Sequence, residues 1–180
     1  MTTLTNSQSY PGSTAISQSP AVSHTTFRLK DPASAITHFI GMVAAVSAAP
    51  FLLERAAQTG HIKSIVSSLL FIISMILLYG ASTFYHAVIT NDRATLLLKK
   101  LDHIMIFVLI AGSYTPICLT VLGGKLGYTL LAVIWGLALF GMILKACWIT
   151  CPKWFSSVIY IAMGWACVAV FGPLLQVLPT

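Results

Sequence analysis

The sequence predicts an all-α integral membrane protein whose helices cross a lipid bilayer. Of its 180 residues, 57% are hydrophobic and only 8% are charged, and the mean hydropathy is +0.89. Soluble domains carry about 25% charged residues, and a soluble fold of this length could not bury so much apolar surface. Lipid is therefore the expected solvent for most of the chain, and helices satisfy all of their own backbone hydrogen bonds there.

Residues 1–30 are expected to form a polar tail in front of a transmembrane domain at 31–180. Residues 1–27 are rich in Ser, Thr, Gln and Pro and contain no Asp, Glu, Lys or Arg. Such a segment buries too little apolar surface to offset its conformational entropy, so we expect it to be disordered. It also lacks the basic start and the apolar stretch of a signal peptide.

Five apolar stretches follow, each close to the roughly 20 residues that a membrane-spanning helix needs. They cover residues 33–53, 64–89, 101–120, 126–144 and 157–178. Because their connections are short and hold most of the charges, consecutive helices should pack as antiparallel neighbours. Pro116 removes a backbone donor near the end of the third stretch and is expected to kink or end that helix.

Small residues recur at intervals of four in the first stretch, at Gly41, Ala45 and Ala49. This spacing lets helix backbones approach closely in lipid. It is compatible with a homo-oligomer, but packing within one bundle is the commoner use and the interpretation that we favour.

The distribution of basic residues predicts a cytoplasmic amino terminus. The side of the tail carries Arg28, Lys30, Arg93, Lys99, Lys100, Lys145 and Lys153, whereas the other side carries only Arg55, Lys63 and Lys125. Lys and Arg concentrate in cytoplasmic loops of membrane proteins. Because the bases are scattered singly, membrane lipids are the expected partners and nucleic acid is not.

Ionisable side chains at membrane depth are costly, which makes them candidates for function. His86 closes the second stretch, Asp102 opens the third, and Ser82 lies one helical turn before His86 on the same face. On adjacent antiparallel helices these three residues should meet near the cytoplasmic end of the bundle. Such a cluster has the chemistry of a metal or proton-transfer site.

The same residue types also have structural explanations. Histidine is tolerated at membrane interfaces, and an Asp in the first turn of a helix stabilises the positive end of the helix dipole. For His38, near the start of the first stretch, we favour a structural role. His103 follows Asp102 directly, points about 100° away around the helix, and is a weaker candidate.

Six short motifs occur in order along the chain: Thr37-His38-Phe39-Ile40-Gly41, Ser82-Thr83-Phe84-Tyr85-His86, Leu101-Asp102-His103, Ile110-Ala111-Gly112-Ser113-Tyr114-Thr115-Pro116, Trp135-Gly136 and Tyr160-Ile161-Ala162-Met163-Gly164-Trp165. None is specific alone. Together they make the chain, from about residue 28 to its end, resemble the bacterial hemolysin III group of the progestin and adipoQ receptor superfamily.

The resemblance implies a seven-helix bundle in the bacterial plasma membrane and a zinc ion near its cytoplasmic face. Three His would bind the zinc: His86, and a His-x-x-x-His pair on the seventh helix. The family groups the positions of Asp102 and Ser82 around that centre, and the implied activity is hydrolysis by a metal-activated water.

The sequence departs from this pattern after its fifth stretch. It ends at Thr180 and has no His after His103, so two of the three implied ligands and the sixth and seventh helices are missing from it. A catalytic zinc normally needs three protein ligands. We favour a fragment of a seven-helix parent over a shortened member without the metal.

Three functions are compatible with these features. The leading hypothesis is a zinc-dependent hydrolase of a lipid amide or ester in the full-length protein, with His86 on the metal, Asp102 orienting the water or accepting its proton, and Ser82 as a hydrogen-bond partner. The second is a channel-forming cytolysin, as the family label suggests. The third is a receptor or membrane-homeostasis factor without catalysis.

Overall fold

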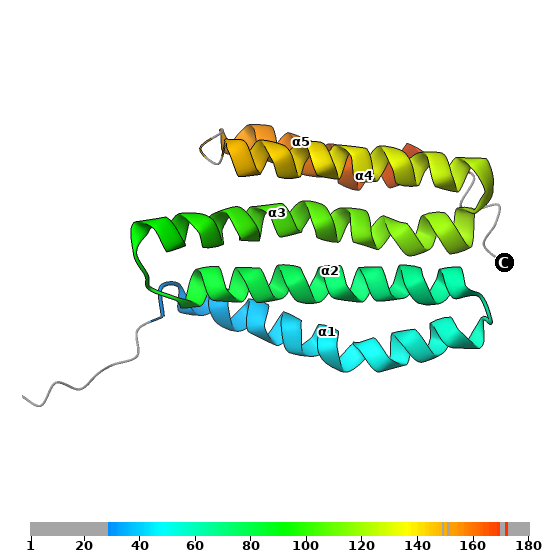
Figure 1. Ribbon diagram of the computed structural model, residues 1–180, viewed down its shortest axis with the longest axis horizontal. Coiled ribbons are helices and arrows are strands. Elements are labelled where there is room, and N and C mark those ends of the chain that lie inside the picture. The colour runs from blue at the N-terminus through cyan, green and yellow to red at the C-terminus, as the bar shows by residue number, and fades with distance from the viewer. Residues whose placement is uncertain (1–28, 149, 151, 170–171, 173–180) are drawn as a thin grey trace, which may run out of the picture.

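The computed structural model describes residues 29–148, 150, 152–169 and 172, and the tail predicted to be disordered lies almost wholly outside them. Within these residues the chain is helical apart from short connections (Figure 1). The elements are α1 (Pro32–Gln58), α2 (Ile62–Ala87), α3 (Asp92–Pro116), the π-helical segment η1 (Ile117–Leu122), α4 (Gly124–Cys147) and α5 (Lys153–Ala169).

Four of these helices are long and apolar enough to cross a membrane: α1, α2, α3 continued by η1, and α4. The fifth, α5, begins before the predicted start at residue 157, and most of the predicted span beyond Ala169 lies outside the described residues. Large apolar side chains face outward, such as Phe51 at 70% exposure and Trp165 at 68%. This surface suits lipid rather than water, and the chain is an all-α integral membrane protein.

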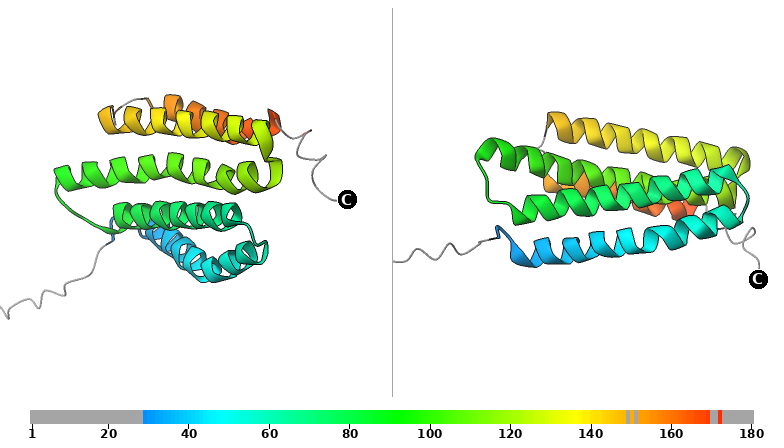
Figure 2. Two further views of the ribbon diagram at one scale, coloured as in Figure 1. Left: turned by 45° about the vertical axis from the view of Figure 1, so that its right-hand side comes forward. Right: turned by 60° about the horizontal axis from the view of Figure 1, so that its bottom comes forward.

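Consecutive helices lie side by side and run antiparallel, as the short connections predict (Figures 1 and 2). α1 packs on α2, α2 on α3, and α3 on α4, while α5 contacts both α3 and α4. The start of α1, the end of α2 and the start of α3 therefore share one end of the bundle. The candidate site residues of the sequence all belong to these three helices.

The small residues of α1 are used for packing within the chain. A Cβ on Gly41 would lie 2.8 Å from the Tyr79 ring of α2, and Ala45 is buried. This agrees with the packing interpretation of the small-residue spacing. Association between copies of the chain stays a prediction.

α3 begins earlier than the sequence predicts, at Asp92 instead of residue 101. The charged run that looked like a connection is helical because Asn91 caps it: the Asn91 side chain accepts a hydrogen bond from the Ala94 N–H at 2.9 Å. Farther along, Lys100 donates to the Ala146 carbonyl in the last turn of α4 at 2.7 Å. A cation at that point complements the negative end of the α4 dipole.

The predicted effect of Pro116 is confirmed, because α3 ends as a regular helix at this residue and continues as η1. The chain then turns at Gly123 and Gly124, whose φ angles of 55° and 51° favour glycine. This turn brings α4 back along α3.

Buried side chains from α3, η1, α4 and α5 form the main core. Its members are Phe107, Ala111, Tyr114, Cys118, Ile134, Ala138 and Met163. The Tyr114 hydroxyl crosses to α5, where it donates to the carbonyl oxygens of Met163 and Gly164 at 2.8 and 2.9 Å and accepts from the Cys167 N–H at 2.9 Å. One side chain thus joins α3 to three backbone groups of α5.

Replacing Tyr114 with Phe should lower the free energy of unfolding by about 1 kcal/mol, because hydrogen bonds between membrane helices contribute about this much. Reversible unfolding in mixed micelles measures the loss. Tyr128→Phe is the matched control, since its hydroxyl bonds only to Lys63 at an exposed position in the described structure. A loss for Tyr114→Phe no larger than that of the control would contradict a stabilising role for the Tyr114 contacts.

Candidate functional site

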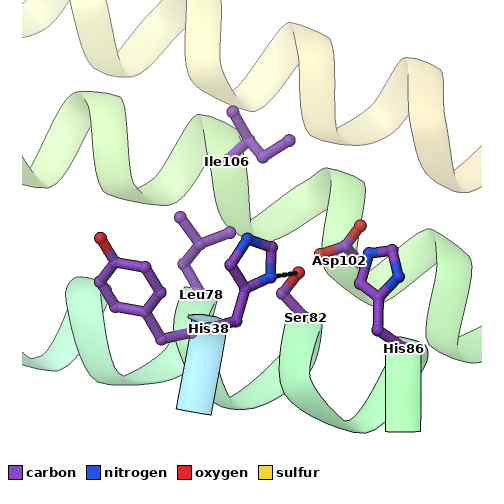
Figure 3. A pocket seen from close by; sticks show the side chains of 7 residues that line it. His38, Leu78, Ser82, His86, Asp102 and Ile106 are labelled. Carbon is purple, nitrogen blue, oxygen red and sulfur yellow. Dashed lines mark hydrogen bonds between the residues drawn. The ribbon is translucent and has the colours of Figure 1, made fainter. Parts of the chain in front are cut away.

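A cavity of about 230 Å³ lies between α1, α2 and α3, toward the end where α1 and α3 begin and α2 ends. Polar and ionisable side chains gather in it although it lies among apolar helices (Figure 3). The lining residues are His38, Leu78, Tyr79, Ser82, His86, Asp102 and Ile106.

Helical spacing explains how these residues converge. α2 contributes Leu78, Ser82 and His86 at intervals of four, and α3 contributes Asp102 and Ile106 at the same interval. Residues four apart share one face of a helix, so each helix presents a stripe of side chains to the cavity. The sequence prediction that His86, Ser82 and Asp102 meet on adjacent helices is confirmed as a placement, while their chemical roles stay predictions.

Ser82 is 4% exposed, and its hydroxyl lies 2.6 Å from Nδ1 of His38 on α1. Which atom donates depends on the tautomer of His38. A buried hydroxyl in a membrane protein needs such a partner, since an unsatisfied polar group is costly in a low-dielectric interior. The pair also fixes the orientation of the His38 ring relative to α2.

His86 is partly buried and contacts both Asp31 and His38. Its Nδ1 lies 3.3 Å from the Asp31 carboxylate, just before α1. Its ring is also packed edge-on against the His38 ring, with the two centroids 5.7 Å apart. Two imidazoles from neighbouring helices therefore border the same cavity.

Asp102 reaches into the cavity from α3 and is 8% exposed. Figure 3 shows its carboxylate extending toward Ser82 and His86 of α2. Among the described residues, its carboxylate pairs with Nδ1 of the adjacent His103 at 3.8 Å. A carboxylate at this depth, beside imidazole groups, is suited to accept or hold a proton.

His103 does not line the cavity. Its Nδ1 lies 2.7 Å from the Lys99 carbonyl, and its own carbonyl accepts a hydrogen bond from Tyr160 at 3.1 Å. The structure thus places His103 outside the cavity and Asp102 in its lining.

The donor types in the cavity are those that zinc binds, namely imidazole nitrogen and carboxylate oxygen. Within the described residues, however, no group of three His, Cys, Asp or Glu side chains is close enough together to hold a metal ion. His86 and Asp102 therefore supply donor chemistry that fits zinc, but the described part of the chain does not complete a site.

Two cavity residues with polar groups, His38 and Tyr79, were not among the predicted site residues. From the sequence we favour a structural role for His38, and the structure adds that this residue is a direct partner of Ser82. Tyr79 was not singled out, although its spacing from Ser82 and His86, three and seven residues, places it on the same helical face. The sequence feature that could have identified Tyr79 is its place on the same helical face as Ser82 and His86. For His38 the feature is an ionisable side chain within an apolar stretch.

Comparison with known proteins adds a family context. The model of the haemolysin-III related family matches residues 27–180. The chain is 42% identical over 149 residues to the Hemolysin-3 homolog of Bacillus subtilis (strain 168), across 82% of this chain and 70% of the relative. It is 39% identical over 152 residues to Hemolysin-3 of Bacillus cereus, across 84% and 69% respectively. No solved structure matches the chain significantly.

Proposed function

The chain belongs to the haemolysin-III related family of membrane proteins, and on this premise we propose that its cavity is the reaction centre of a zinc-dependent hydrolase that cleaves an amide or ester bond in a lipid. The observation that supports this most is the convergence of His38, Ser82, His86 and Asp102 on one cavity among apolar helices. The described donors account for part of such a metal site, so the proposal requires further ligands from outside the described residues.

Each cavity residue has a role in this proposal. His86 would hold the zinc through an imidazole nitrogen, and a bound zinc supplies a water whose pKa is lowered toward neutrality. Asp102 would orient a water at the site and accept its proton. Ser82 holds His38 in place through their hydrogen bond of 2.6 Å.

The apolar part of the lining suits a lipid substrate. Leu78 and Ile106 border the same cavity as the polar groups, and Figure 3 shows Leu78 on the side of His38 away from His86 and Ile106 above His38 in this view. A substrate with an acyl chain can place that chain against Leu78 and Ile106 while its carbonyl group approaches His86 and Asp102. The proposal therefore names an amphipathic substrate and not a soluble one.

Metal analysis tests the role of His86. Purified full-length protein should contain zinc, and His86→Ala should reduce the zinc content to background because an imidazole ligand is lost. His61→Ala is the matched control, since His61 is exposed in the connection at the opposite end of α2. Equal zinc content in His86→Ala and the unmodified protein would remove His86 from the metal site.

A second candidate function is lysis of membranes, which the names of the relatives favour, since one is named Hemolysin-3 and the other a Hemolysin-3 homolog. Dye release from liposomes separates it from the first. Release at concentrations where an unrelated membrane protein is silent supports a lytic activity. Lipid cleavage without dye release supports the hydrolase.

A further inference from the structure

The segment before α1 is attached to the last turn of α2 by backbone contacts. The Asp31 N–H donates to the His86 carbonyl at 2.8 Å, and the Lys30 N–H donates to the Ala87 carbonyl at 3.3 Å. The Lys30 ammonium group also lies 3.4 Å from the Tyr85 carbonyl and 3.7 Å from the centre of the Tyr85 ring. The position of Asp31 relative to His86 is therefore set by the main chain.

The Asp31 side chain contacts both Ser34, in the first turn of α1, and His86. Asp31 occupies the N-cap position of α1, but within the described chain its side chain makes no capping hydrogen bond. One carboxylate oxygen, Oδ2, accepts a hydrogen bond from the Ser34 hydroxyl at 2.7 Å and lies 3.3 Å from Nδ1 of His86. The second distance is slightly longer than a typical N–H···O hydrogen bond.

The charge of Asp31 determines what it can offer to His86. An Asp side chain ordinarily has a pKa of about 3.9, and the hydrogen bond from the Ser34 hydroxyl lowers the pKa of Asp31 further. The carboxylate is therefore ionised at neutral pH and can only accept hydrogen bonds. An imidazole nitrogen facing it is favoured in the N–H form.

We propose that Asp31 is a positioning residue that keeps the proton of neutral His86 on Nδ1 and leaves the lone pair of Nε2 available to the cavity. Because the two ring nitrogens of a neutral imidazole share one proton, fixing it on one nitrogen frees the other. Histidines that bind metals commonly donate their second N–H to a carboxylate in this way. The consequence for zinc rests on the proposed function, whereas the tautomer of His86 does not.

Nitrogen NMR of the histidine rings tests this directly in the metal-free protein. The chain is labelled on His side-chain nitrogens and measured at about pH 8, where an ordinary imidazole is neutral, and the His86 signals are assigned from their loss in His86→Gln. In the unmodified protein the Nδ1–H tautomer should predominate. In Asp31→Ala the two tautomers should become mixed, because the side-chain contact is lost while the backbone hydrogen bond to the His86 carbonyl can remain.

Two further variants make the test specific. Asp31→Glu should restore a predominant Nδ1–H form, since it returns a carboxylate to the segment. Asp92→Ala removes an exposed carboxylate at the same end of the bundle, and it should leave the His86 signals unchanged. Identical His86 signals in Asp31→Ala and the unmodified protein would overturn the inference.

The two proposals can fail separately. If His86→Ala abolishes zinc binding while Asp31→Ala changes neither the tautomer nor the affinity for zinc, the hydrolase proposal stands and the positioning role is wrong. If Asp31→Ala changes the tautomer but the protein binds no zinc, the positioning role stands and the hydrolase proposal loses its metal. When both hold, Asp31→Ala should weaken zinc binding roughly 10- to 100-fold.

Discussion

Replacing Gly141 with Val should separate α4 from α3 and cause a loss of stability larger than that of Tyr114→Phe. A Cβ at Gly141 would meet the Phe107 ring, with Cδ1 of that ring only 2.7 Å away and Cε1 and Cζ nearer still. Phe107 is fully buried and stacks on the Tyr160 ring at a centroid distance of 4.6 Å. Because Tyr160 belongs to α5, a shift of the Phe107 ring would push against that helix.

The expected cost of Gly141→Val is about 3 kcal/mol, the upper part of the usual range for overpacking a well-packed core. Unfolding in mixed micelles measures the cost. Gly136→Val is the control in the same helix, because a Cβ at Gly136 would meet no atom of the described structure within 4 Å. Both variants change helix propensity equally, so their difference reports the contact with Phe107. Equal stabilities would mean that α3 and α4 are not packed as described.

The helices and the main partners in the site could be predicted from the sequence because each depends on local periodicity. The apolar stretches predict the spans, and the short connection between α2 and α3 predicts that His86 and Asp102 lie at one end. The interval of four places Ser82 with His86. These inferences need only the helical repeat and the direction of the chain.

The partner of Ser82 depends on information that local patterns do not contain. Whether His38 faces α2 depends on the rotation of α1 about its axis, and this rotation is set by tertiary packing. Gly41 lies against Tyr79, and Ala45 is buried. The sequence shows the small residues but not which neighbouring helix they face, so His38 could be placed near the site but not assigned to Ser82.

Asp31 was overlooked for a different reason. It lies at the boundary between the polar tail and α1, where an Asp before Pro32 is normally explained as a helix start signal. Its contact with His86 joins positions 55 residues apart in the sequence, and the backbone hydrogen bond from Asp31 to the His86 carbonyl is a tertiary contact. Hydropathy likewise misplaced the start of α3, because the helix there is defined by the Asn91 cap instead of by apolar residues.

Asp102→Asn should remove most of the proposed hydrolysis while leaving the fold intact. Asn has nearly the same shape as Asp and can still hydrogen-bond, but it cannot accept the proton of a water. Loss of a positioned general base typically lowers the rate about 10²- to 10⁴-fold. Stability should change little, because Asn is nearly isosteric with Asp. The ion pair that is lost, within the described residues, is the 3.8 Å contact with the adjacent His103.

The measurement is release of fatty acid from long-chain amides and esters presented in mixed micelles, by full-length protein of matched zinc content. Asp92→Asn is the control, since it makes the same change at an exposed position at the same end of the bundle. Retained zinc with lost turnover would show that Asp102 acts in the reaction and not in metal binding. Substitution of His86, in contrast, is expected to remove the metal itself. If Asp102→Asn cleaves lipid as fast as Asp92→Asn, the buried carboxylate does not handle the proton. The cavity would then need another base, and the His38 imidazole also borders it.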